Sequence, residues 1–171
     1  MDFEALAKSR YSVRNFDGRP LSGDDLDYLL SIAHLAPTGC NYQPQRIYVV
    51  QSDAALAKLH SLSRCIFGAK TVLIFAYDTT EDWKNKLEPG VHSGEQDVSI
   101  VASHVMLAAW ERGIGSCWVN YFANELLRQE MGLPEQERVV LLMPMGYPAA
   151  DAAPLPLHSQ FRPMAETVHY I

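Results

Sequence analysis

Apolar side chains recur every three or four positions in several stretches of the chain, and this spacing predicts amphipathic helices. The first helix is expected over residues 2–9. A second and a third follow Ser22 and Ser52, whose hydroxyl groups can accept a hydrogen bond from the first turn. Pro37 ends the second helix, because proline does not fit a helix interior.

Two further helices are expected in the second half of the chain. The stretch from Glu95 to Arg112 is apolar round most of its circumference and is followed by Gly113, which is typical of a helix end. We expect it to be a central or an interface helix. The last helix lies around Leu126 and Leu127 and ends at Gly132.

Continuous apolar runs predict the strands. Residues 46–51 are apolar rather than alternating, which predicts a strand buried on both faces. Residues 71–77 form a second buried strand, residues 138–146 supply a further strand, and residues 116–121 read as a strand or an extended turn. Strands and helices interleave irregularly, so we expect an α+β sheet with helices packed on it.

Two stretches fall outside these elements. Residues 78–94 are the most polar part of the chain, and we interpret them as a lid or an excursion. The tail beyond Tyr147 contains four prolines, which favour an extended conformation over a helix. Such a tail is expected to wrap over another part of the molecule.

Length and charge narrow the classes of function. A chain of 171 residues is expected to form a single domain over residues 1–171. With 14 basic and 20 acidic residues, a net charge of −6 argues against nucleic-acid binding. No apolar run reaches membrane-spanning length and the first residues do not resemble a signal peptide, so a cytoplasmic protein is expected.

One basic cluster stands out in this acidic chain. If residues 10–16 run extended, Arg10, Ser12 and Arg14 share one face and Tyr11 and Val13 share the other. Two guanidinium groups and a hydroxyl suit a phosphate, although a solvated turn with surface arginines would have the same sequence. The loop between Pro37 and Pro44 adds polar amides that can hold the edge of a heterocycle.

Several other kinds of site are excluded or disfavoured. The chain has no phosphate-binding Walker loop, no serine-hydrolase elbow and no zinc-protease motif, and the glycine turn at residues 113–116 lacks the third glycine of a dinucleotide fingerprint. The six histidines and three cysteines show no metal-ligand spacing. We interpret His104 as a core residue and Cys117 as a buried thiol. A phosphorylated aromatic cofactor fits the remaining clusters, with Arg162 as a further basic residue.

Four segments resemble the nitroreductase family of FMN-dependent flavoproteins. They are residues 10–16, residues 36–44, residues 113–118, and Gly146-Tyr147-Pro148 together with Arg162-Pro163. The resemblance implies a sandwich with a central mixed or antiparallel sheet, an intimate homodimer, and one FMN per subunit at the dimer interface.

The resemblance also implies roles for individual residues. Arg10, Ser12 and Arg14 would hold the phosphate and ribityl chain with main-chain help from Tyr11, and Arg162 would join them. The loop between Pro37 and Pro44 would reach the flavin from the partner subunit. A main-chain N–H near Asn120 would face flavin N5. The remaining implied contacts are Pro37, Thr38, Gly39, Asn41, Gln43, Trp118, Val119 and Tyr121.

The implied activity is electron transfer from NADH or NADPH through flavin N5 to a small conjugated acceptor, a nitroaromatic compound or a quinone, by a ping-pong mechanism. No catalytic side chain is needed, because the flavin carries the chemistry. Two alternatives stay open: a flavin-binding redox sensor or carrier without turnover, and a relative that performs reductive dehalogenation or flavin fragmentation.

Overall fold

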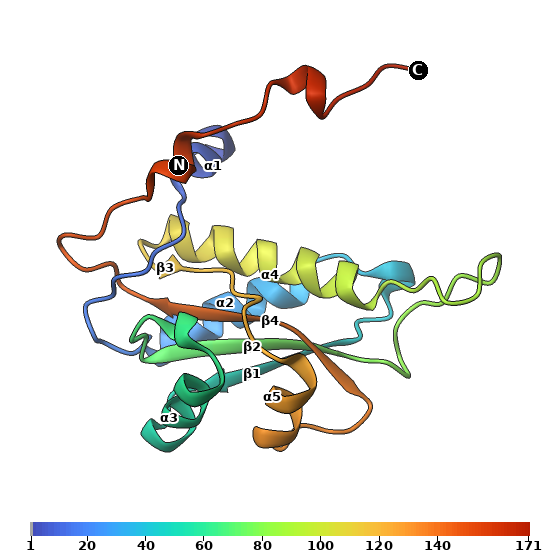
Figure 1. Ribbon diagram of the computed structural model, residues 1–171, viewed down its shortest axis with the longest axis horizontal. Coiled ribbons are helices and arrows are strands. Elements are labelled where there is room, and N and C mark those ends of the chain that lie inside the picture. The colour runs from blue at the N-terminus through green and yellow to red at the C-terminus, as the bar shows by residue number, and fades with distance from the viewer. Residues whose placement is uncertain (1) are drawn as a thin grey trace.

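A four-stranded antiparallel sheet forms the centre of the computed structural model, which describes residues 2–171 (Figure 1). The strand order is β1-β2-β4-β3, with every pair antiparallel. The strands are β1 (Gln45–Val50), β2 (Thr71–Asp78), β3 (Gly115–Ser116) and β4 (Glu137–Gly146). The long central strands β2 and β4 pair from Thr71 to Asp78, and every residue of β2 is buried.

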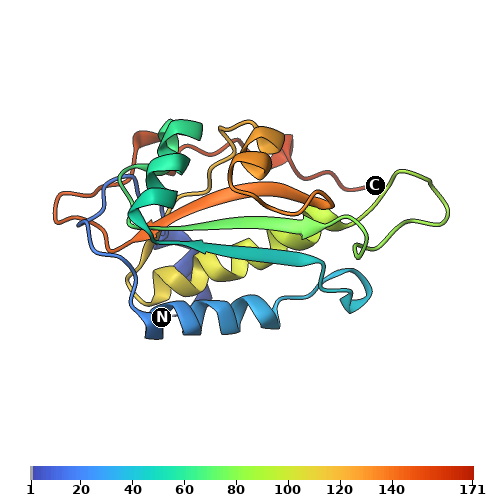
Figure 2. The ribbon, with the colours of Figure 1, turned by 90° about the horizontal axis from the view of Figure 1, so that it is seen from below.

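Helices cover both faces of the sheet (Figure 2). Helices α2 (Gly23–Leu35) and α4 (Gly94–Glu111) cover one face, where Leu73 and Phe75 point from β2. Helices α3 (Asp53–Leu62) and α5 (Asn124–Glu130) cover the other face, where Val72 and Ile74 point. Successive β2 residues therefore enter opposite cores, as the strand period requires. The predicted α+β sandwich is confirmed.

Side-chain caps begin the first three helices where the sequence predicted them. Asp2 accepts a hydrogen bond from the Ala5 N–H at 2.8 Å at the start of α1 (Phe3–Ser9). Ser22 caps α2 and Ser52 caps α3 in the same way. Each cap satisfies a backbone donor that the first helical turn leaves free.

Two expectations about burial are wrong. Strand β1 was expected to be buried on both faces, but it is the edge strand of the sheet, and of its residues only Val50 is buried. An edge strand has a neighbour on one side only, so helices cover it incompletely. His104 is exposed on the outer side of α4, where its Nδ1 lies 2.8 Å from the Ile100 carbonyl oxygen.

The segment that follows α1 and the start of the C-terminal tail run side by side beyond the β3–β4 side of the sheet. The Ala149 N–H donates to the Asn15 carbonyl at 3.1 Å, so the start of the tail runs beside the segment that follows α1. The tail is extended, as expected, apart from single 3-10 turns at Pro156–Ser159 and Met164–Glu166. Figure 1 shows α1 and the tail together, away from the sheet.

The polar stretch after β2 is an excursion from the sandwich. It projects from the end of β2 and returns to α4 (Figure 2). An isolated bridge between Lys84 and His92 holds its two arms together, and the Asn85 N–H donates to the Val91 carbonyl at 2.9 Å. Asp82 is buried within it and pairs with Lys84 and His92. Among residues 2–171, no helix has the length and apolar character needed to cross a membrane.

Candidate functional site

The cluster at residues 10–14 is an extended segment attached to the edge of the sheet. Ser12 bridges to Ser116 of β3, and the Val13 N–H donates to the Ser116 carbonyl at 2.9 Å. Val13 is fully buried against Gly115, where an added Cβ would lie 2.6 Å from Val13 Cγ2. Because Val13 points inward, its neighbours Ser12 and Arg14 face outward, as the alternation predicted.

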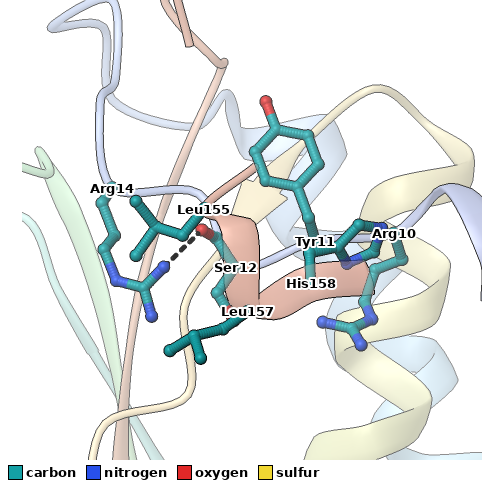
Figure 3. A pocket seen from close by; sticks show the side chains of 7 residues that line it. All are labelled: Arg10, Tyr11, Ser12, Arg14, Leu155, Leu157 and His158. Carbon is teal, nitrogen blue, oxygen red and sulfur yellow. Dashed lines mark hydrogen bonds between the residues drawn. The ribbon is translucent and has the colours of Figure 1, made fainter. Parts of the chain in front are cut away.

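These outward side chains line a cavity of about 260 Å³, which we call the arginine cavity (Figure 3). Arg10 and Arg14 lie on either side of Ser12, and Arg14 Nη1 donates to the Ser12 carbonyl at 3.1 Å. Among residues 2–171 neither arginine forms an ion pair within 4 Å. The cavity thus concentrates positive charge, which suits an anion with several acceptor oxygens. Its lining comprises Arg10, Tyr11, Ser12, Arg14, Leu155, Leu157 and His158.

Two residues differ from the pattern expected for this cluster. Tyr11 was placed on the opposite face, but it also lines the cavity; its ring packs edge-on against Trp110 at 5.1 Å and its hydroxyl donates to the Ala152 carbonyl. Arg162 lies outside the cavity lining, with its side chain 80% exposed and Nη1 3.6 Å from Glu166. The tail instead brings His158 into the cavity, which the sequence analysis missed.

The segment from Trp118 to Tyr121 follows β3, to which residues 10–14 are attached. Val119 pairs with Leu142 of β4, so Trp118 is half-buried while Asn120 and Tyr121 are exposed. The Asn120 side chain donates to the Val140 carbonyl at 3.3 Å. Within residues 2–171, the backbone N–H of Asn120 has no hydrogen-bond acceptor, so it is available to a ligand.

A 3-10 turn at Arg64–Ile66 links the arginine cavity to this segment. The Arg14 guanidinium lies 5.8 Å from the ring centroid of Phe67, just after the turn. Arg64, at its start, lies 5.0 Å over the ring of Tyr121, and Ser63 donates to the Tyr121 carbonyl. Arg64 does not stand out in the sequence, because a single arginine in a Ser-Arg-Cys stretch carries no motif.

A second cavity of about 570 Å³ opens on this linking turn. Its lining comprises His60, Ser61, Leu62, Ser63, Arg64, Asn120, Tyr121, Phe122 and Ala123. Asn120 and Tyr121, which the resemblance assigned to the flavin, therefore face a space large enough for an aromatic ring system.

The loop of residues 37–43, which we call the amide loop, contains backbone in the left-handed region. Cys40, Asn41 and Gln43 all have positive φ, at 49°, 58° and 53°. The Thr38 hydroxyl accepts a hydrogen bond from the Gln43 N–H at 3.0 Å and closes the turn. Such conformations are uncommon outside glycine and persist where surrounding contacts fix them.

The contact that fixes the amide loop comes from the start of α4. The Gly39 N–H donates to Oδ1 of Asp97 at 2.7 Å, and the Ser93 hydroxyl donates to Oδ2 at 2.6 Å. Gly39 has no room for a side chain, because a Cβ would lie 2.9 Å from Ser93 Oγ and 3.1 Å from Trp83 Cβ. A buried carboxylate thus joins the loop, α4 and the excursion.

The amide loop and the arginine cavity lie at opposite ends of the sheet (Figure 1). The amide loop leads into β1 beside Asp78. Residues 10–14, which we call the arginine segment, instead meet β3 at the other end of the sheet, where Gly146 of β4 and Thr71 of β2 lie. The eight residues of β2 between these ends span roughly 25 Å. One copy of the chain therefore does not bring Pro37, Gly39 or Asn41 to the arginine cavity.

Two ionisable groups near the arginine end have shifted acidities. Burial raises the pKa of the Cys117 thiol, which disfavours its nucleophilic thiolate. The Tyr147 hydroxyl, helped by Ser22, holds the pKa of Asp25 below its ordinary value, and the Tyr147 oxygen lies 2.6 Å from Asp25 Oδ2. Within the described residues, no group of three His, Cys, Asp or Glu side chains could hold a metal ion.

Comparison with known proteins agrees with this architecture. A crystal structure of a nitroreductase family protein from Clostridium difficile 630 is 34% identical, with a TM-score of 0.92, covering 99% of this chain and 98% of that one. An "FMN-dependent Nitroreductase" from Clostridium difficile R20291 is 23% identical, with a TM-score of 0.79 and 98% of each chain covered.

A curated relative from Archaeoglobus fulgidus carries the name "Putative NADH dehydrogenase/NAD(P)H nitroreductase". It is 29% identical over 147 residues, which make up 82% of each chain. The family model described as "Nitroreductase family" matches residues 7–66 and 59–147, and so includes the arginine segment, the amide loop and the whole sheet. The chain therefore belongs to the nitroreductase family.

Proposed function

We propose that this protein is an FMN-dependent oxidoreductase that takes electrons from NADH or NADPH and reduces a small conjugated acceptor, such as a nitroaromatic compound or a quinone. The observation that carries the proposal is the arginine cavity, in which Arg10, Ser12 and Arg14 converge without an acidic neighbour in the lining. Family membership and the names of the relatives support the same activity.

The residues present fit the parts of FMN at different places. The arginine cavity, at about 260 Å³, is below the roughly 300–1,000 Å³ typical of a complete small-molecule site, so it suits the phosphate and the adjoining ribityl chain. The larger space beside Asn120 and Tyr121 suits the ring system. The turn at Arg64–Ile66 connects the two, which supports one ligand extending across both.

The residues of the chain would bind and orient the cofactor. Arg10 and Arg14 would donate paired hydrogen bonds to phosphate oxygens and neutralise their charge. The free N–H of Asn120 would donate to the ring system, where a donor stabilises developing negative charge. When bound, FMN would supply the redox chemistry, accepting hydride at N5 from the nicotinamide and passing electrons to the acceptor in a ping-pong order.

The positions of the amide loop and the cavity support a homodimer as part of this proposal. Since the loop lies at the far end of the sheet, residues Pro37, Thr38, Gly39, Asn41 and Gln43 would reach FMN only from a second copy. Apolar side chains also remain exposed along α1 and the tail, at Phe3 (70%), Leu157 (72%) and Phe161 (85%). A second copy covering these side chains would remove them from water.

The decisive experiment is an absorbance spectrum of the purified protein, followed by anaerobic titration with NADH and NADPH. Flavin bands that bleach with either donor are expected. A protein that is colourless and gains no thermal stability from added FMN would overturn the proposal. Bound flavin that neither donor reduces would point to a redox sensor or carrier. Steady-state assays with nitroarenes and with halogenated phenols would then distinguish nitroreduction from dehalogenation.

A further inference from the structure

The tail of this protein is almost entirely exposed to solvent except at two positions. Of residues 151–171, only Ala152 and His158 are partly buried. Ala152 accepts the hydrogen bond from the Tyr11 hydroxyl, and His158 lies in the arginine cavity. The 3-10 turn at Pro156–Ser159 therefore places a single imidazole where the sequence resemblance implied the guanidinium of Arg162.

Contacts far apart in the sequence hold the tail in this path. The Asn15 side chain donates to Asp151 Oδ1 at 2.8 Å, and the Ala149 N–H donates to the Asn15 carbonyl. Tyr11 then holds the chain at Ala152, and its ring lies 6.3 Å from the imidazole of His158. Figure 3 shows the imidazole beside the side chain of Arg10, and the two residues line the arginine cavity together.

We infer that His158 is a third cationic ligand of the FMN phosphate and that it binds a proton together with the cofactor. The inference rests on the proposed function. Histidine changes its charge near neutral pH, unlike arginine, so it makes affinity depend on pH. A phosphate close to a dianion, bound in the same cavity, would attract an imidazolium at this position.

The charged groups around His158 agree with this role. The segment of residues 10–14 presents Arg10, Arg14 and the phenol of Tyr11. From α1, Glu4 and Lys8 line a neighbouring groove that His158 shares, and they form an ion pair with each other. Among the described residues 2–171, no acidic side chain lines the arginine cavity itself, so a bound phosphate would be the anion that His158 meets there.

The test is a set of binding titrations with the full chain freed of flavin. FMN, riboflavin and inorganic phosphate are titrated into wild-type protein and His158→Gln between about pH 6 and pH 8.5, a range that spans the ordinary titration of histidine. Riboflavin lacks the phosphate, and inorganic phosphate lacks the ring. His169→Gln is the matched control, because it removes a histidine of the same tail outside the cavity lining. Calorimetry in two buffers counts the protons taken up.

We expect His158→Gln to weaken FMN binding about tenfold near pH 6 and hardly at all near pH 8.5. Riboflavin binding should not change, and proton uptake with FMN should fall relative to wild type. Because the free cofactor's phosphate titrates identically in both experiments, the ratio of the two dissociation constants reports the contribution of the imidazole.

Equal FMN affinities for wild type and His158→Gln at every pH would overturn the inference. If FMN still bound more tightly than riboflavin in that case, the proposed function would stand. If neither flavin bound to wild type, the proposed function would fail and the inference with it. If His158→Gln weakened riboflavin binding by the same factor as FMN binding, the phosphate role would be overturned. Such a result would show a general disturbance of the tail.

Discussion

The arginine cavity and the amide loop are the two regions that the resemblance assigned to one cofactor, and they are built in opposite ways. In the cavity, ordinary extended backbone attached to β3 turns charged side chains outward. In the loop, left-handed backbone is fixed by the carboxylate of Asp97. A substitution in the cavity should therefore change binding and spare the fold, whereas a substitution at Asp97 should change the fold first.

The largest effect is expected for Asp97→Ala. The change leaves the Gly39 N–H and the Ser93 hydroxyl without their acceptor, so the free energy of unfolding should fall by about 3 kcal/mol. Denaturant unfolding monitored by circular dichroism would measure it. Asp27→Ala, on the exposed side of α2, should stay within about 0.5 kcal/mol of wild type. Equal losses in the two variants would show that Asp97 does not hold the loop.

Arg14→Ala is the opposite case. Removing one charge-assisted contact should weaken FMN binding about 30-fold, equivalent to about 2 kcal/mol, and leave the unfolding of the flavin-free protein unchanged. Fluorescence titration with FMN would measure the affinity. Arg162→Ala should bind FMN like wild type, because Arg162 lies outside the cavity. A comparable loss in Arg162→Ala would show that the tail follows a different path in the cofactor-bound protein.

Gly115→Ala tests how the arginine segment is held. The new methyl group would press on Val13, so we expect a loss of about 1.5 kcal/mol in unfolding free energy, together with weaker FMN binding. Thermal unfolding and FMN titration of one preparation would detect both effects. Gly23→Ala is the control, since a Cβ there meets no atom within 4 Å. If the Gly115→Ala protein were destabilised but bound FMN normally, packing at Val13 would not control the orientation of Ser12 and Arg14.

The smallest effect is expected for the pH dependence of stability that Asp25 contributes. The Tyr147 hydroxyl lowers the pKa of Asp25, so the stability that this carboxylate contributes is fully present above about pH 4 and is lost as the pH falls below that value. Asp25→Asn should therefore be less stable than wild type at neutral pH, by less than about 1 kcal/mol, and the difference should shrink in acid. Urea unfolding at pH 7 and pH 3 would show it; a difference that grows in acid would contradict this sign.

The sequence predicted the features that depend on neighbouring residues. Helix caps at Ser22 and Ser52 and the inward position of Val13 follow from local spacing, and the structure has them. The exposure of β1 could not be predicted in this way, because a strand's burial depends on its place in the sheet. His104 shows the same limit, since an apolar helix can still present one face to solvent.

Contacts between distant segments were also beyond prediction. The position of His158 depends on the contacts of Tyr11 and Asn15 with the tail, which join residues 141 and 136 positions apart. The hold of Asp97 on Gly39 joins residues 58 positions apart. Neither pairing leaves a motif, so the sequence indicated Arg162 in the tail, whereas the structure places His158 in the cavity with Arg10 and Arg14.

The exposed tail has a consequence for proteolysis. Leu157 and Phe161 are open to solvent in a single copy of the chain, and the tail beyond Ala152 contributes no residue to either hydrophobic core. A protease that cuts before the turn at Pro156–Ser159 should release one wall of the arginine cavity and leave the sandwich folded. The expected fragment keeps the circular dichroism spectrum of the intact chain and should bind FMN more weakly than the intact chain does.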